Sequence, residues 1–341
     1  MNISFHYYVT RVLAEKAGFA PADAQTIAFA CQQVDDANRH TPMKVKNLPP
    51  PEYERMSDGV FDPTCTAHKG ITNILYGFTG IRRKILMPFH FIPEAWDSTR
   101  RHYKYLTIPG APLAHTMVKI ALEKLSSSAG NPLFRQLALI KLGIALHGYE
   151  DSFAHQGFSG RNNKLDNDAT DILDAERVRL NETQLIGQLV GFIGYHIGHG
   201  LLGDLPDKIG IVAYYLNGRG LAVMLDNVAR FTLAAEKTFA LLRDFTGFAT
   251  DWPSISTQMV KMLSGELPNL AAKSGKTDWQ KTFSKNFPEI SFDYKAQAWE
   301  REALRQNSGG SFTYKGESGQ KWIHFHRAAF EQRQFMLANL K

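Results

Sequence analysis

The segment 132–155 is the strongest constraint on how this chain can fold. It is predicted to be one long helix, because apolar residues fill most of its positions and Pro132 suits a helix start. His147, Asp151 and His155 follow at intervals of four residues, so on a helix they share one face. A buried face with two imidazoles and a carboxylate must satisfy each of these groups. We therefore predict a well-buried helix whose polar face binds one or two metal ions, with a hydrogen-bonded polar network or a surface stripe as the alternatives.

Helical periodicity recurs along most of the remaining sequence. Further helices are expected at 8–17, 22–37, 113–125, 174–203, 209–215, 221–244, 255–263, 296–305 and 321–340. With no internal repeat and no clean boundary, these elements predict a single all-α domain over 1–341. The helical region 206–341 has no evident role in the candidate site.

The connecting segments are expected to be of three kinds. Residues 41–69, with Pro49-Pro50-Pro51, predict a loop-rich insertion. The short apolar run 85–92 is interrupted by Pro88, which favours a strand or an extended entry to a helix. Residues 156–170 are polar and predict a surface loop, and residues 307–320 predict a hairpin or loop.

Composition decides which metal ligands are available. The chain has 12 histidines but only Cys31 and Cys65, which cannot build a disulfide framework or a cysteine-based zinc site. Imidazole and carboxylate would have to supply the ligands, and these suit zinc. The net charge of +6 is mild for 341 residues, so it permits a phosphate-bearing partner without pointing to nucleic acid.

Further candidate ligands lie in apolar surroundings outside 132–155. His196 and His199 are three residues apart in the most apolar run of the chain, and His196 sits deeper in that run. Two adjacent acids end the second expected helix, where the helix dipole disfavours negative charge and a cation would be favourable. Read singly, each could be a packed core histidine or a solvated helix end. The candidate metal ligands are His6, Asp35, Asp36, His90, His147, Asp151, His155, His196 and His199.

The order of these residues resembles the zinc-dependent phospholipase C and S1/P1 nuclease superfamily. An early histidine, an acid that ends a helix, a His in a Phe-His-Phe context, an H-x₃-D helix and a late histidine pair follow one another within residues 1–205. Members of that superfamily are all-α enzymes with three zinc ions in a cleft. The chain also resembles an uncharacterised bacterial family with Phe-His-Tyr-Tyr and Val-Asp-Asp-Ala stretches.

The superfamily resemblance implies a role for each candidate. His6 resembles the histidine that binds a zinc together with the chain's N-terminal residue, and Asp35 or Asp36 resembles the acid of a Trp-Ala-Asp stretch. His90 resembles the histidine of a His-Tyr-Ile segment. His147 and Asp151 match the H-x₃-D pair, in which the aspartate bridges two metals, and His155 and His196 resemble ligands of the more exposed zinc.

One family ligand has no direct counterpart in this chain. The family places a carboxylate four residues after its last histidine, where this chain has Gly200. His199 or Asp204 would have to substitute, or one metal is lost. The resemblance therefore implies two or three zinc ions.

The implied function is hydrolysis of a phosphoric ester by a metal-activated water, with catalytic roles for Asp35 or Asp36 and for Asp151. A phospholipase-C-like enzyme with transient membrane-surface contact is expected first, and an S1/P1-like nuclease second. A non-catalytic, metal-stabilised helical binding protein remains the alternative outside enzymes. The chain has no H-E-x-x-H signature, which argues against a zincin protease.

The location follows from what the sequence lacks. The N-terminus carries no basic region followed by an apolar stretch, so a cytoplasmic protein is the default expectation, with signal-independent export as the other route. The apolar run 185–202 is long enough to span a membrane, but it holds Gln188, His196 and His199. A helix buried within the fold is therefore expected there, and no transmembrane segment.

Overall fold

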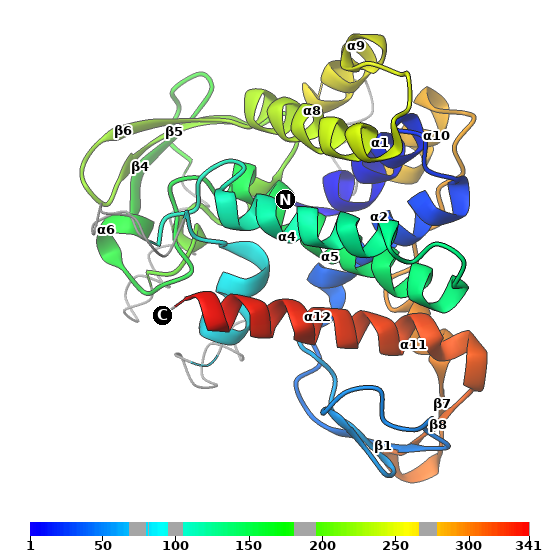
Figure 1. Cartoon of the computed structure of the whole chain (residues 1–341). Helices are drawn as coiled ribbons and strands as arrows, with labels where there is room; N and C mark the ends of the chain where they lie inside the picture. The colour runs from blue at the N-terminus through cyan, green and yellow to red at the C-terminus, as the bar shows by residue number, and fades with distance from the viewer. Residues whose placement is uncertain (68–79, 81, 95–104, 181–195, 266–277, 341) are drawn as a thin grey trace.

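The fold is built around one central helix, as a computed structural model shows for residues 1–67, 80, 82–94, 105–180, 196–265 and 278–340 (Figure 1). That helix is α5 (Pro132–Ala154), which confirms the helix expected at 132–155. It begins where the Asn131 side chain accepts hydrogen bonds from the backbone N–H groups of Leu133 and Phe134. Helices from both ends of the sequence pack against it, namely α2 (Pro21–Asp36), α4 (Pro112–Ser126), α8 (Asn227–Thr246) and α12 (Gln320–Asn339).

Two glycines of α5 allow neighbouring elements to come unusually close. A Cβ atom at Gly143 would lie 2.3 Å from the backbone oxygen of Ile27 in α2. A Cβ atom at Gly148 would lie 2.4 Å from Cδ1 of Ile92, two residues after the end of η3 (Arg82–His90). Since no larger residue fits without a shift, these glycines bring α2 and η3 against the polar face of α5.

The remaining helical elements are short and lie around this core. Helices η1 (Ser4–Val9) and α1 (Thr10–Lys16) lead into α2. The others are α6 (Lys164–Asn167), η4 (Gly200–Leu202), η5 (Leu205–Asp207), α9 (Trp252–Leu263), α10 (Trp279–Asn286), α11 (Ala298–Ala303), η6 (Ser308–Gly310) and η7 (Gly316–Gly319).

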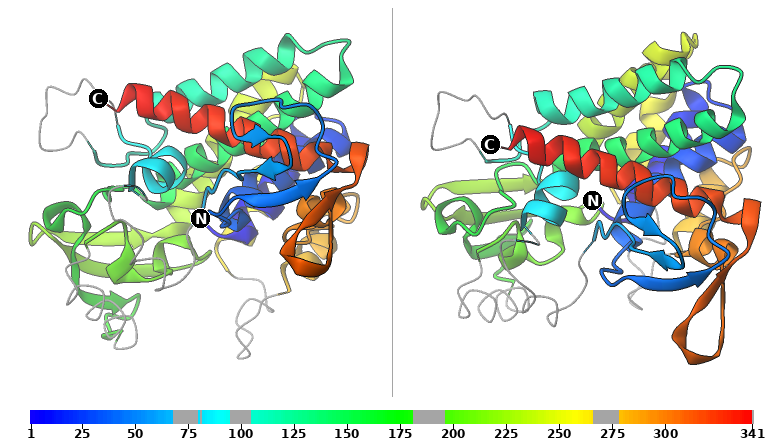
Figure 2. Two further views of the ribbon diagram at one scale, coloured as in Figure 1. Left: turned by 90° about the horizontal axis from the view of Figure 1, so that it is seen from below. Right: turned by 60° about the horizontal axis from the view of Figure 1, so that its bottom comes forward.

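The described residues include two β-sheets, so the prediction of an all-α fold is wrong. One sheet is antiparallel, with the order β4-β5-β6. The other is mixed, with the order β2-β3-β1-β8-β7, and its β1 and β8 are parallel. The sheets lie apart, on different sides of the helices (Figure 2). The strands are β1 (Met43–Lys46), β2 (Met56–Ser57), β3 (Val60–Phe61), β4 (Ala169–Asp174), β5 (Val212–Asn217), β6 (Ala222–Asp226), β7 (Leu304–Gln306) and β8 (Phe312–Tyr314).

The antiparallel sheet replaces one expected helix and the start of a second, whose remaining residues form α8 as expected. Residues 209–215 and the start of 221–244 form β5 and β6, which are joined by a turn at 218–221. In β5 the buried side chains of Ala213 and Tyr215 alternate with partly exposed ones, which is the period-two pattern of a strand. The segment is too short for this alternation to be distinguished from one face of a helix.

Three other local predictions have different outcomes. The run 85–92 is largely not extended, because residues 82–90 form the π-helix η3, which contains Pro88. The insertion at 41–69 contains β1, β2 and β3, and β8 follows β7 in the hairpin expected near 307–320. The polar segment 156–170 includes α6 and the buried Ser159, so it is only partly a surface loop.

The helix predicted at 174–203 largely falls outside the described residues, since 181–195 are not among them. On either side of that gap the chain is not α-helical: Asp174 ends β4, and residues 196–203 form a turn and η4. Among the residues that the structure describes, no helix combines the length and apolar character that a membrane span requires.

Candidate metal centre

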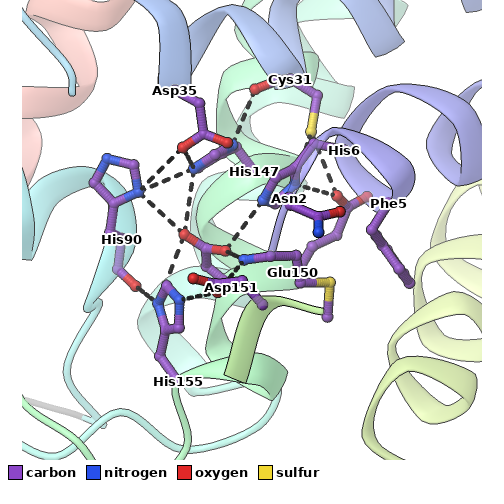
Figure 3. A network of polar contacts seen from close by, with 12 residues as sticks. Asn2, Phe5, His6, Cys31, Asp35, His90, His147, Glu150, Asp151 and His155 are labelled. Atoms are coloured by element: carbon purple, nitrogen blue, oxygen red, sulfur yellow. Dashed lines mark hydrogen bonds and ion pairs between the residues drawn. The ribbon is translucent and has the colours of Figure 1, made fainter. Parts of the chain in front are cut away.

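The polar face of α5 is buried, as the sequence predicts. His147, Asp151 and His155 are 0%, 1% and 4% exposed. Side chains from η1, α2 and η3 meet them there (Figure 3). His199 and Asp207 from the 199–207 segment join them, so the site draws on parts of the chain that are far apart in sequence.

Asp151 lies at the centre of the site, and its two carboxylate oxygens face different partners. Oδ1 accepts a hydrogen bond from the Met1 ammonium group and lies 3.1 Å from His6 Nε2. Oδ2 lies 3.1 Å from His90 Nδ1 and 3.2 Å from His147 Nε2. One carboxylate therefore contacts two pairs of nitrogen atoms, one pair at each of its oxygens (Figure 3).

The first cluster consists of Asp35, His90 and His147, whose ligand atoms lie within 4.8 Å of one another. His90 Nε2 lies 2.8 Å from the backbone oxygen of Thr66, and His147 Nδ1 lies 2.9 Å from that of Cys31. Because a backbone carbonyl only accepts, each of these ring nitrogens carries the hydrogen atom. In a neutral ring the other nitrogen then has a free lone pair.

The free nitrogens of this cluster point at one another. His90 Nδ1 and His147 Nε2 are 3.1 Å apart, and Asp35 Oδ1 lies 3.9 Å and 3.7 Å from them. Together with Asp151 Oδ2 they form a group of four acceptors without a donor of their own when both rings are neutral. Such a group requires a cation, either added protons or a metal ion.

The second cluster, which consists of His155, His199 and Asp207, repeats this pattern. His155 Nδ1 lies 2.8 Å from the backbone oxygen of His90, and His199 Nδ1 lies 2.8 Å from that of Gly203. Their Nε2 atoms face the Asp207 carboxylate at 2.9 Å and 3.4 Å. Again two imidazole lone pairs and a carboxylate converge.

The Met1 amine lies between the carboxylates and is completely buried. It is 3.1 Å from Asp207 Oδ1, on the side away from its contact with Asp151. Burial alone would lower the pKa of the amine, but the carboxylates of Asp151, Asp207 and Asp35 raise it to about 11. A buried cation thus occupies the space between the carboxylates of Asp151 and Asp207.

The same charges act on the carboxylates in the opposite direction. Burial favours the neutral acid, but His155, the Met1 ammonium group and His147 hold the pKa of Asp151 well below its usual range. The Met1 ammonium group and His199 likewise lower the pKa of Asp207, against the effect of burial. Both carboxylates are therefore ionised and offer negative charge to a cation.

A third group of possible ligands, His6, Cys31 and His147, is already engaged in hydrogen bonds. His6 Nδ1 lies 2.9 Å from Glu150 Oε2, and His147 Nδ1 lies near the Cys31 backbone oxygen. Burial, with the charge of Glu150 next, raises the pKa of the Cys31 thiol well above its usual value. This group lines one side of the site and is less suited to bind a metal than the two clusters, because its ligand atoms already make hydrogen bonds.

The structure brings together seven of the nine candidates named from the sequence. They are His6, Asp35, His90, His147, Asp151, His155 and His199. His196 instead pairs with Asp168, and Asp36 accepts a hydrogen bond from the Tyr294 hydroxyl group. Neither His196 nor Asp36 belongs to any of the three groups of ligand atoms.

Sequence reasoning missed Asp207. It considered Asp204 as the acid that could assist, but Asp204 is exposed and pairs with Lys208. Asp207 lies at the end of η5, eight residues after His199. The turn at residues 203–204 and the short helix η5 place it in the site, and a spacing rule for one helix could not have found it.

Comparison with known protein families gives a match that covers nearly the whole chain. The family described as "Family of unknown function (DUF6765)" matches residues 1–340. The chain belongs to this family. Searches of the curated proteins and of the solved structures find no match. The geometry of the site is therefore the main guide to its chemistry.

Proposed function

We propose that this member of the family is a zinc-dependent phosphoric ester hydrolase of the phospholipase C type. The observation that carries the proposal is the convergence on Asp151. His90 Nδ1 and His147 Nε2 lie 3.1 Å apart with their other nitrogens engaged by backbone carbonyls, and both face Asp151 Oδ2. A metal ion would bind the lone pairs of these acceptors, so that no additional protons are needed to satisfy them.

The proposed ligand sets follow from the clusters. Asp35, His90 and His147 would hold one zinc together with Asp151 Oδ2, which lies 3.1 Å from His90 Nδ1 and 3.2 Å from His147 Nε2. His155, His199 and Asp207 would hold a second. The Met1 amine, His6 Nε2 and Asp151 Oδ1 would hold a third, once the amine has lost its proton. Imidazole and carboxylate donors fit zinc better than calcium or magnesium, which prefer oxygen alone.

Zinc in such sites lowers the pKa of a water molecule to about 7 and polarises phosphoryl oxygens. The protein residues would contribute position and charge. Asp151 would be shared by two metals, as the partners of its two oxygens suggest. Asp35, whose side chain is 26% exposed, is the acid best placed to accept a hydrogen bond from an attacking water and orient it.

The proposed substrate is a phosphodiester, with a phospholipid placed before a nucleic acid. The net charge of +6 on 341 residues is too mild to indicate a nucleic-acid track. The preference is for a lipid headgroup presented at a membrane surface. An S1/P1-like nuclease and a non-catalytic, metal-stabilised protein are the alternatives that the test separates.

The test is hydrolysis by zinc-loaded protein of phosphatidylcholine vesicles, single-stranded DNA and a small chromogenic phosphodiester. Asp151→Asn should abolish turnover, whereas Asp36→Asn, an equally conservative change outside the clusters, should leave it within about twofold. Cleavage of DNA but not lipid would favour the nuclease. Zinc binding without turnover of any substrate would overturn the enzyme proposal.

A further inference from the structure

A second buried polar cluster lies behind the candidate metal centre. It consists of Thr10, Cys31 and Glu150, none of which is in the proposed ligand sets. Glu150 is 0% exposed, although an apolar side chain would be the usual choice at such a position of α5. A buried carboxylate is costly unless its oxygens have partners, so its presence calls for an explanation.

The partners of Glu150 come from three different elements. Oε1 accepts a hydrogen bond from the Thr10 hydroxyl group at 2.8 Å, and Oε2 accepts one from the Cys31 thiol at 3.3 Å. Oε2 also lies 2.9 Å from His6 Nδ1. The carboxylate is thus held from both sides and presents one oxygen to the His6 ring (Figure 3).

The His6 ring is fixed in two ways. Glu150 and Asp151, successive residues of α5, face its opposite nitrogens, with Asp151 Oδ1 3.1 Å from Nε2. The face of the ring stacks on His147, with centroids 3.9 Å apart. Stacking restrains the tilt of the ring, and the contacts of the two nitrogens with Glu150 and Asp151 fix which edge of the ring faces Asp151.

We infer that Glu150 is a positioning residue that holds His6 with Nε2 directed towards Asp151 and the metal site. This inference rests on the proposed function, since His6 would be a zinc ligand. A carboxylate that engages the remote nitrogen of a ligating histidine fixes the ring and strengthens it as a donor. Thr10 and Cys31 hold the carboxylate in place for that role.

The test compares zinc affinity and stoichiometry in Glu150→Gln and in the unsubstituted protein, by competition with a chromophoric chelator. Glu150→Gln preserves the shape of the side chain but replaces one of its two carboxyl oxygens, the possible partners of His6 Nδ1, with an amide nitrogen. It should lower the affinity for one zinc about 10- to 100-fold and leave the other sites unchanged. The absorption spectrum of the cobalt-substituted protein should change at one site only.

Two further variants keep the inference falsifiable if Glu150→Gln does not fold. Thr10→Val removes one hydrogen bond to Glu150 and should weaken the same zinc site by a smaller factor. Cys31→Ser keeps a donor at its position and should bind zinc as the unsubstituted protein does. The control Asp36→Asn, which also replaces a carboxyl group with an amide, should retain every zinc.

The outcomes separate the two proposals. If the unsubstituted protein takes up no zinc, the proposed function fails and this inference fails with it. If it binds zinc and Glu150→Gln binds the same number with the same affinity, the role of Glu150 is overturned while the proposed function stands. An equal loss at every site would also overturn the inference, because a general loss of packing has no preference for His6.

Discussion

His90 Nδ1 and His147 Nε2 lie 3.1 Å apart, although each ring directs its other nitrogen to a backbone carbonyl oxygen. Two neutral imidazoles in this arrangement have lone pairs that face each other. The carboxylate of Asp151 lies beside both and adds negative charge, so neither ring receives a hydrogen bond from it. A cation between these groups removes the conflict.

The two late histidines give a prediction that distinguishes the ligand seen in the structure, His199, from the one favoured by the sequence, His196. His199→Gln should remove the zinc of the second cluster, because His199 Nε2 faces Asp207. His196→Gln should retain it, because His196 pairs with Asp168. Elemental analysis of the two matched variants gives the answer. Loss of zinc in His196→Gln and not in His199→Gln would contradict the ligand set.

The close approach of α2 to α5 gives a prediction about stability. Gly143→Ala would place a methyl group 2.3 Å from the Ile27 backbone oxygen, so it should lower the free energy of unfolding by about 1–3 kcal/mol. Because α2 carries Asp35, zinc affinity should also fall. Urea unfolding measures the first effect. Gly80→Ala, for which no atom of the described residues lies within 4 Å of the added Cβ, is the control and should change little.

The Met1 ammonium group gives the metal-free protein a pH dependence. Its pKa is raised from 8.0 to about 11 in the folded state, so its stabilising effect is complete below about pH 8. That effect is lost as the pH rises from about 8 to about 11. The urea midpoint of metal-free protein should therefore fall over this range. Asp207→Asn, which removes one partner of the ammonium group, should make the fall shallower, and an equally steep fall would count against the buried ion pair.

Extra residues before Met1 would have to displace a buried amine. A chain extended at that end should bind one zinc fewer, and its hydrolytic rate should drop. A chain with the same extension after Lys341 should behave as the unextended one. The comparison is made by zinc content and by initial rates on a chromogenic phosphodiester. Equal zinc content in the two extended chains would exclude the amine as a ligand.

The central part of the site could be predicted from sequence because it lies on one helix. His147, Asp151 and His155 share a face through the helical repeat alone. The roles of His196 and His199 are harder to predict, because the sequence pattern indicates a helix over 174–203. It is a turn in which Gly198 has a φ of +55° and packs against Phe91, and this turn places His199 at the site.

The sheets could not be predicted for a different reason. Strand β1 pairs in parallel with β8, so Val45 lies opposite Phe312, far away in the sequence. Local periodicity carries no information about such a pairing, and strands of two to four residues give little pattern. The missed Asp207 is a similar case, because its position depends on how the 199–207 segment turns back to α5.

The most direct measurement of the central claim is equilibrium dialysis of metal-free protein against zinc, followed by elemental analysis. Uptake of two or three zinc ions per chain, reduced in Asp151→Asn and unchanged in Asp36→Asn, is the predicted result. No uptake of zinc by the unsubstituted protein, or the same uptake in Asp151→Asn, would contradict a metal centre built around Asp151.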